Sequence, residues 1–229
     1  MKKFFGMVVC AALAFASAQV SAQTLALATS NPSATSAPAT TPVAERPKLS
    51  VGERWSFDAS GPKGAFFFTL AVEEVKPDGK LFMVTHKSNG TAQRMIWSAD
   101  LNPISSHSLD WSQVLLDHGN SEYALYRFPL YVGKEWKEDY GPWGYRRTIT
   151  AKVVEHKQQR LEALGDAFEL FCVENEILFQ STGRKMQEQY CYSPALRMTV
   201  SYLGKENGQT YSGWKLIKHE PALPQVSQR

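Results

Sequence analysis

Apolar and aromatic residues recur in short runs from Pro47 onward, and turn signals separate these runs about every ten to fifteen residues. Each turn signal places Gly, Asn, Asp or Pro between two runs, and these residues suit the backbone of a tight turn. The runs that we expect to form strands are Phe66–Val75, Leu81–His86, Ala92–Trp97, Arg146–Val154, Phe168–Glu174, Lys185–Tyr192, Met198–Tyr202 and Thr210–Ile217.

Several of these runs alternate in polarity with a period of two residues. Val200 and Tyr202 face away from their neighbours in an extended chain, and Trp214 and Leu216 share one face in the same way. Short, regularly spaced strands with Gly and Pro turns predict a mainly β protein. We expect a single curled antiparallel sheet, as a partly open barrel or a sandwich, with at most one or two short helices.

The segment Ser108–Asp117 does not alternate cleanly. A short helix or an irregular crossover fits it best.

The first twenty-two residues differ in character from the rest of the chain. Two lysines at positions 2 and 3 precede an apolar stretch, which closes on small residues up to Ala22. This pattern predicts a secretory signal peptide over residues 1–22. An uncleaved membrane anchor is the alternative, but the apolar run is shorter than the roughly 20 residues that span a bilayer. Cys10 lies inside the apolar run after two valines, so it is a poor lipidation site.

Cleavage of the signal changes the charge of the protein. The full chain has 25 Lys and Arg against 22 Asp and Glu, a net charge of +3. Loss of Lys2 and Lys3 leaves 23 basic residues against 22 acidic ones, which is +1. A surface so close to neutrality does not favour nucleic acid or anionic membranes as partners. We therefore expect no nucleic-acid partner. We also expect no transmembrane anchor after cleavage, because no other stretch approaches the roughly 20 apolar residues that span a bilayer.

Composition divides the remaining chain into three parts. Residues 23–47 are mostly Ala, Thr, Ser and Pro, which predicts a disordered linker. Residues 48–221 form the expected β domain, which is large enough to fold without a cofactor. Residues 222–229 are an expected flexible tail.

Two cysteines, Cys172 and Cys191, remain in the mature chain. An even number of cysteines in an exported protein favours one disulfide, and the alternatives are two buried free thiols or half of a metal site. A structural zinc site requires four ligands, so these two cysteines alone do not predict one.

The sequence contains no familiar catalytic or phosphate-binding motif. It lacks H-E-x-x-H, G-x-S-x-G and the glycine-rich phosphate loops. The nearest approach to a ligand or catalytic cluster is formed by His107, Asp110, Asp117 and His118, which a dispersed hydrolase site would use. An ordinary polar loop explains the same residues, so we predict neither a metal nor an enzyme.

Aromatic residues are frequent, and core packing is the simplest explanation for most of them. A concave ligand pocket is the alternative. The best candidates for exposed, ligand-binding rings lie in a Gly/Pro-containing loop with charged neighbours: Trp136, Tyr140, Trp143 and Tyr145.

Three segments together resemble a family of uncharacterised exported bacterial β-domains. Phe128–Trp136 is similar to the family pattern FPL-x-VGK-x-W, and Tyr190–Val200 is similar to YWYSPELGRVV. The segment Val153–Phe171 matches a third pattern, V-x-x-x-E followed by PAGTF, more loosely.

The chain departs from this family in three places. Gly165-Asp166-Ala167 stands where the family has Ala-Gly-Thr, and Arg197-Met198 stands around the usual Gly-Arg. Cys191 replaces a Trp, which together with Cys172 supports a cross-strand disulfide.

The resemblance implies an envelope domain without known catalytic residues. At the level of fold it implies similarity to the half-barrels of lipoprotein carriers, which bind acyl chains on a concave apolar face. The sequence as a whole therefore predicts a periplasmic or secreted, non-enzymatic binding or interaction module of a Gram-negative cell envelope. Its expected partner is an envelope protein or an apolar ligand; a lipid carrier and an envelope hydrolase are the alternatives.

Overall fold

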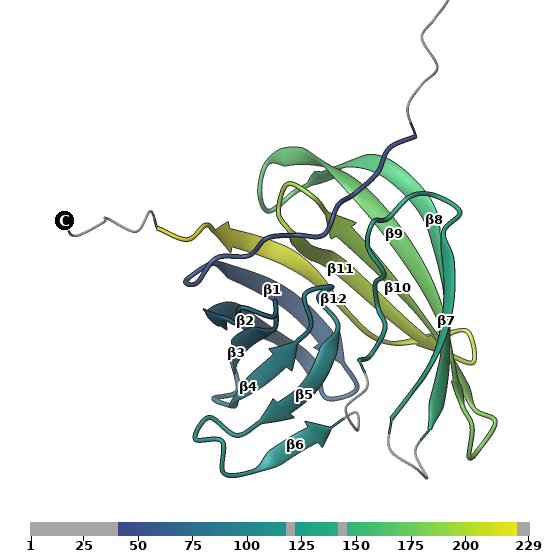
Figure 1. Ribbon diagram of the computed structural model, residues 1–229, viewed down its shortest axis with the longest axis horizontal. Coiled ribbons are helices and arrows are strands. Elements are labelled where there is room, and N and C mark those ends of the chain that lie inside the picture. The colour runs from purple at the N-terminus through teal and green to yellow at the C-terminus, as the bar shows by residue number, and fades with distance from the viewer. Residues whose placement is uncertain (1–40, 118–121, 142–145, 224–229) are drawn as a thin grey trace, which may run out of the picture. The chain divides into compact units, whose positions relative to one another are not determined.

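The computed structural model describes residues 41–117, 122–141 and 146–223. Within these ranges all regular structure is β, and Figure 1 shows the strands in chain order. The strands are β1 (Arg54–Gly61), β2 (Gly64–Val75), β3 (Leu81–Lys87), β4 (Ala92–Trp97), β5 (Pro103–His107), β6 (Val114–Asp117), β7 (Glu135–Tyr140), β8 (Arg147–Leu161), β9 (Asp166–Phe179), β10 (Lys185–Ser193), β11 (Met198–Glu206) and β12 (Gln209–Glu220).

All twelve strands belong to one antiparallel sheet, with the order β6-β5-β4-β3-β2-β1-β12-β11-β10-β9-β8-β7. The sheet consists of two meanders, β1–β6 and β7–β12, which the pairing of β1 with β12 joins in the middle. In the described part of the chain β6 and β7 are paired on one side only, so the sheet is open. The mainly β, curled antiparallel sheet expected from the sequence is confirmed.

Each of the eight expected runs lies on a strand, apart from Arg146, which precedes β8 by one residue, because alternation and turn residues are local signals. The helix considered for Ser108–Asp117 is wrong: the described residues contain no helix. Ser108–Gln113 forms a turn there, and β6 follows it. None of the described segments is therefore a helix that could cross a bilayer.

The connector between β6 and β7 shapes the fold. These strands are consecutive in the chain but lie at opposite edges of the sheet, so the connector must run from one edge to the other (Figure 1). Its residues Ala124, Tyr126 and Leu130 are fully buried. The Tyr126 hydroxyl lies 2.7 Å from Oγ1 of Thr199, and the Tyr126 backbone N–H donates to Asn102 Oδ1. The connector therefore fills the space between the two meanders.

The described end of the expected linker also packs against the β domain. Ala44 is 1% exposed and pairs with Leu130 through two backbone hydrogen bonds of 2.8 Å. Arg46 forms an ion pair with Asp100 at 2.5 Å. Residues 41–47 thus belong with the domain, while the expected signal peptide and the rest of the linker lie outside the described residues.

Candidate functional site

The sheet has two faces that differ in their side chains. We call the face that carries the core the inner face, and the opposite one the outer face. On β12, Trp214 and Leu216 point inward as expected from the alternation, and Trp214 packs on Phe57 of β1 at a centroid distance of 4.8 Å. Lys215 lies between them in sequence, so it points outward.

The inner face is filled by the protein's own side chains. Trp55, Phe57, Tyr126 and Tyr192 are at most 1% exposed and belong to one core cluster. The concave apolar face that the family resemblance implies is therefore occupied by core and connector residues.

A cavity of about 850 Å³ lies over the outer face. We call it the outer groove. The strands β1, β10, β11 and β12 form its floor, and the end of the β8–β9 hairpin forms a wall. The residues that line it include Asp58, Lys157, Arg160, Leu161, Glu162, Gln189, Cys191, Leu203, Lys215 and Ile217. A cavity of this size matches the roughly 300–1,000 Å³ of small-molecule sites.

The hairpin wall exists because β8 and β9 are longer than their neighbours. β9 pairs with β10 only from Phe171 to Leu178, so Asp166–Leu170 continues past β10 together with the end of β8. Leu161, at the end of β8, is half-buried, as are Leu203 and Ile217 on the floor. These three side chains give the groove an apolar strip between exposed charged groups.

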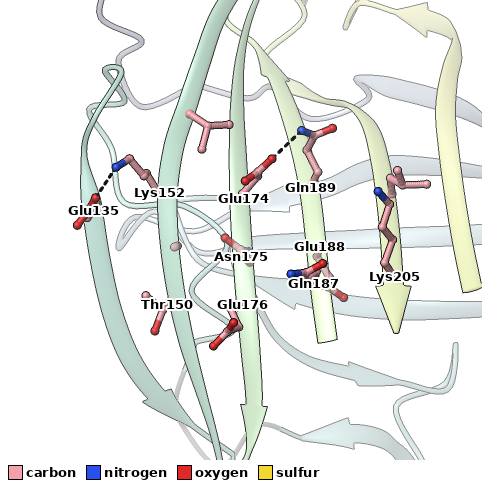
Figure 2. Close-up of a pocket in the computed structure, with 13 residues that line it drawn as sticks. Glu135, Thr150, Lys152, Glu174, Asn175, Glu176, Gln187, Glu188, Gln189 and Lys205 are labelled. Atoms are coloured by element: carbon pink, nitrogen blue, oxygen red, sulfur yellow. Dashed lines mark hydrogen bonds and ion pairs between the residues drawn. The ribbon is translucent and has the colours of Figure 1, made fainter. Parts of the chain in front are cut away.

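A second, more polar pocket of about 400 Å³ adjoins the outer groove, because Gln189 and Leu203 line both cavities. Its residues come from the neighbouring strands β7 to β11, as Figure 2 shows. Glu135 and Lys152 form an ion pair at 2.7 Å, and Gln189 donates to Glu174 at 3.4 Å. Glu135, Lys152 and Glu174 are therefore engaged with partners inside this pocket.

Beneath this polar pocket, on the inner face, Glu188 accepts hydrogen bonds from four tyrosines. The hydroxyls of Tyr123 and Tyr190 donate to Oε2, the latter at 2.7 Å. Those of Tyr202 and Tyr211 donate to Oε1 at 3.1 and 3.0 Å. Glu188 is only 8% exposed, so these donors replace the water that the carboxylate loses. We call this group the tyrosine cluster.

Gly204 makes room for the cluster. It lies opposite Glu188 in the β10–β11 register, and a Cβ atom there would lie 2.6 Å from Cζ of Tyr211. The absence of a side chain lets Tyr202 and Tyr211 approach each other, with their hydroxyl oxygens 2.7 Å apart. The cluster ties β10, β11 and β12 to the connector, and so fixes the strands that form the floor of both cavities.

Burial raises the pKa of these tyrosines. The pKa values of Tyr123 and Tyr190 are well above the ordinary value, first because of desolvation and then because of the Glu188 charge. Desolvation also raises the pKa of Tyr202 and Tyr211, and brings that of the neighbouring Tyr140 to about 12. All five hydroxyls are therefore neutral at physiological pH.

These shifts predict sensitivity to alkali. Above about pH 10 the unfolded chain loses tyrosine protons that the folded chain keeps, so stability falls as pH rises, by up to about 1.4 kcal/mol per pH unit for each such tyrosine. Urea unfolding between pH 8 and 11, with tyrosinate absorbance followed in parallel, measures this. A free energy of unfolding that stays constant over that range would contradict the buried network.

The position of the expected aromatic site in the structure differs from what the sequence led us to expect. Trp136 and Tyr140 lie on β7 rather than in a loop. Tyr140 is 2% exposed, and the half-buried Trp136 donates from Nε1 to the Ala124 carbonyl at 2.9 Å. The expectation of an exposed loop is wrong for these two rings, because both pack toward the connector. Trp143 and Tyr145 lie outside the described residues.

The structure does not show the four polar residues considered for a hydrolase site as one cluster. His107 Nε2 lies 2.9 Å from Ser105 Oγ, and Asp110 accepts from Ser108 and Ser112 within the turn before β6. Those hydrogen bonds lower the pKa of Asp110 to about 2. His118 and the side chain of Asp117 lie outside what the structure describes. No group of three or more metal-ligating side chains occurs among the described residues.

Cys172 and Cys191 form a disulfide, as expected. They lie directly opposite each other on β9 and β10, and Cys191 lines the outer groove. The bond therefore joins two strands behind the groove, next to the hairpin wall.

Sequence reasoning missed Glu188, although a signal was present. Met186, Glu188 and Tyr190 fall on one face of the strand that the sequence predicts, and this face is the apolar one. A carboxylate at such a position requires donors from elsewhere in the fold. The outer groove had no local signal, because its residues come from six strands.

Fold and site together define a disulfide-linked, open-sheet β protein with a ligand-sized groove on its outer face. No family model matches the chain, and no curated protein matches it. The family resemblance of the three segments therefore stays a prediction.

Among solved structures the chain is similar to three bacterial proteins. A protein of YmcC-like fold from Bacteroides fragilis is 16% identical, with a TM-score of 0.45, and the match covers 77% of this chain and 99% of that one. A lipoprotein-class protein from Parabacteroides distasonis is 14% identical with a TM-score of 0.47, at 77% and 99% coverage. The hypothetical lipoprotein YmcC from Escherichia coli is 11% identical with a TM-score of 0.46, at 75% and 86% coverage. Similarity at this level assigns neither family nor function to the chain.

Proposed function

We propose that this chain is an exported, non-enzymatic binding protein that holds an amphipathic small molecule in the outer groove. The observation that carries the proposal is the groove itself, which combines a volume of about 850 Å³ with an apolar strip and exposed charges. Ligand sites generally have this mixture, since apolar surface supplies affinity and a few polar groups supply orientation.

The sequence and the disulfide support an extracytoplasmic location for this function. The N-terminal pattern is that of a secretory signal, and a disulfide persists in oxidising compartments such as the periplasm. Cys172 and Cys191 are 0% and 5% exposed, so the bond is shielded from small thiols. We propose a periplasmic or secreted protein.

Leu203→Glu is expected to weaken binding of a dodecyl amphiphile at least tenfold, because it puts a charge on the apolar floor that both cavities share. Titration of the purified mature protein with dodecyl amphiphiles below their micellar concentration, followed by calorimetry and native mass spectrometry, measures the loss. Leu223→Glu is the matched control, since Leu223 is 87% exposed and follows β12. If the wild type binds no amphiphile, or if both variants bind as it does, the groove is not the site.

One further observation favours an interaction module as a second candidate. The two edges of the sheet differ: β7 carries Glu135, Lys137, Glu138 and Asp139, whereas β6 exposes Val114 by 61% and Leu115 by 51%. Charged edges prevent strand addition, and apolar ones permit it.

Strand addition between two copies would make the wild type self-associate through β6. Replacing Val114 and Leu115 by lysine is expected to abolish this association, because like charges then face each other across the edge. Sedimentation velocity over a hundredfold concentration range measures it. A wild type that stays monomeric throughout removes pairing between copies from consideration.

A further inference from the structure

Building on the proposed function, we propose that the outer groove selects single-chain amphiphiles with a zwitterionic head, in which an ammonium group accompanies a phosphate or carboxylate. The charges that line the groove carry this inference.

Four exposed charged side chains line the groove without engaging one another: Asp58, Arg160, Glu162 and Lys215. None of them forms an ion pair or side-chain hydrogen bond with another described residue. The fifth charged side chain of the groove, Lys157, is paired with Glu155 at 2.7 Å.

One cation and one anion lie on the floor of the groove, and one of each lies on its wall. Asp58 on β1 and Lys215 on β12 are opposite each other in the register and project from the floor. Arg160 and Glu162 belong to the end of the β8–β9 hairpin, which is the wall. Both signs are thus available on the floor and on the wall.

This arrangement differs from that of the adjoining polar pocket. There Glu135 pairs with Lys152, and Glu176 pairs with Lys185 at 3.0 Å. Of the charged side chains that line the polar pocket only Lys205 lacks a described partner, whereas four of the five that line the outer groove lack one.

A head group of one sign would meet attraction and repulsion together in the groove. An anion would be drawn to Arg160 and Lys215 but repelled by Asp58 and Glu162, and a cation would meet the reverse. A zwitterion pairs its anionic group with the two basic side chains and its ammonium group with the two carboxylates. It therefore avoids the like-charge repulsion that a head group of one sign meets.

The apolar strip accounts for the rest of the ligand. Leu161 on the wall and Leu203 and Ile217 on the floor are half-buried beside the charged groups. An alkyl chain lying on these residues would be removed from water, which favours its binding.

The test uses four amphiphiles with one dodecyl chain and different heads. Dodecylphosphocholine is zwitterionic, dodecyl phosphate anionic, dodecyltrimethylammonium cationic and dodecyl maltoside uncharged. Each is titrated below its micellar concentration into the purified mature protein by calorimetry, with native mass spectrometry for stoichiometry. We expect dodecylphosphocholine to bind at least tenfold more tightly than the other three.

Two double variants are expected to shift the preference for the head group in opposite directions. Asp58→Asn with Glu162→Gln is expected to favour dodecyl phosphate, and Arg160→Gln with Lys215→Gln is expected to favour the cationic amphiphile. All four positions are exposed, so thermal unfolding should match the wild type. Lys63→Gln, in the exposed β1–β2 turn, is the control and should leave the order of affinities unchanged.

The outcomes separate this inference from the proposed function. Equal binding of all four amphiphiles, or a preference for a singly charged head, overturns the inference but leaves the groove as a binding site. Binding of none of them overturns both. A zwitterionic preference that survives both double variants also overturns the inference, because its selectivity then comes from other residues.

Discussion

Replacing Glu188 by alanine is expected to destabilise the protein by about 4 kcal/mol, the largest effect of any single substitution considered for this chain. The carboxylate accepts from four tyrosines, and three of these hydrogen bonds span 2.7–3.1 Å. Its removal takes their shared acceptor from these hydroxyls, and each buried hydroxyl that stays unsatisfied costs about 1–3 kcal/mol. Urea unfolding at neutral pH, monitored by far-UV circular dichroism, measures the loss.

Glu174→Ala is the matched control for this substitution. Glu174 is a glutamate on the neighbouring strand β9, but it is exposed and accepts one long hydrogen bond from Gln189. Its loss should change the free energy of unfolding by no more than about 0.5 kcal/mol. Equal effects of the two substitutions would mean that the tyrosine cluster does not stabilise the fold.

Removing the disulfide is expected to cost about 3 kcal/mol. Cys172 and Cys191 are 19 residues apart in sequence, and a bond that closes a loop of this size restricts the unfolded chain by about that amount. The double variant Cys172→Ala/Cys191→Ala should therefore unfold at a lower urea concentration. Both positions are buried, so the small cavities add to the loss.

Reduction of the wild type separates the bond from the cavities. Wild-type protein unfolded with a strong reductant should lose most of the same free energy, whereas the double variant should not respond to the reductant. Alkylation of the unfolded, unreduced mature protein should find no free thiol. Two alkylated cysteines would contradict the bond and remove its support for an oxidising compartment.

The disulfide also affects the proposed site. Cys191 lines the outer groove, and its partner lies on the strand that continues into the hairpin wall. A bond at this position keeps the strands beneath the wall in register. The double variant is therefore expected to bind amphiphiles more weakly than the wild type even where it remains folded.

Strand positions could be predicted from the sequence because their signals are local. Trp214 and Leu216 alternate with polar neighbours, and a pleated strand places them on one face regardless of what covers it. β7 was missed because Lys137, Glu138 and Asp139 hide its alternation. Its inward side chains include Trp136 and Tyr140, and Glu138 is satisfied by Arg127 of the connector at 2.6 Å.

The sites depended on contacts that the sequence does not display. Tyr123 reaches Glu188 from 65 positions away because the connector crosses between the two meanders. Lys215 and Arg160 line one groove because the β8–β9 hairpin is longer than β10. No periodic pattern encodes either juxtaposition.

By itself the sequence determined the class of fold, most of its strands and the pair of cysteines available for a bond. These properties depend on alternation, turn residues and composition, which act over a few neighbouring positions. The tertiary structure alone decided that β6 and β7 stand at opposite edges, that the connector fills the inner face, and that the cavity lies on the outer one. Those features arise from packing between distant segments, in which the burial of Tyr126 and Leu130 outweighs any local preference of the chain.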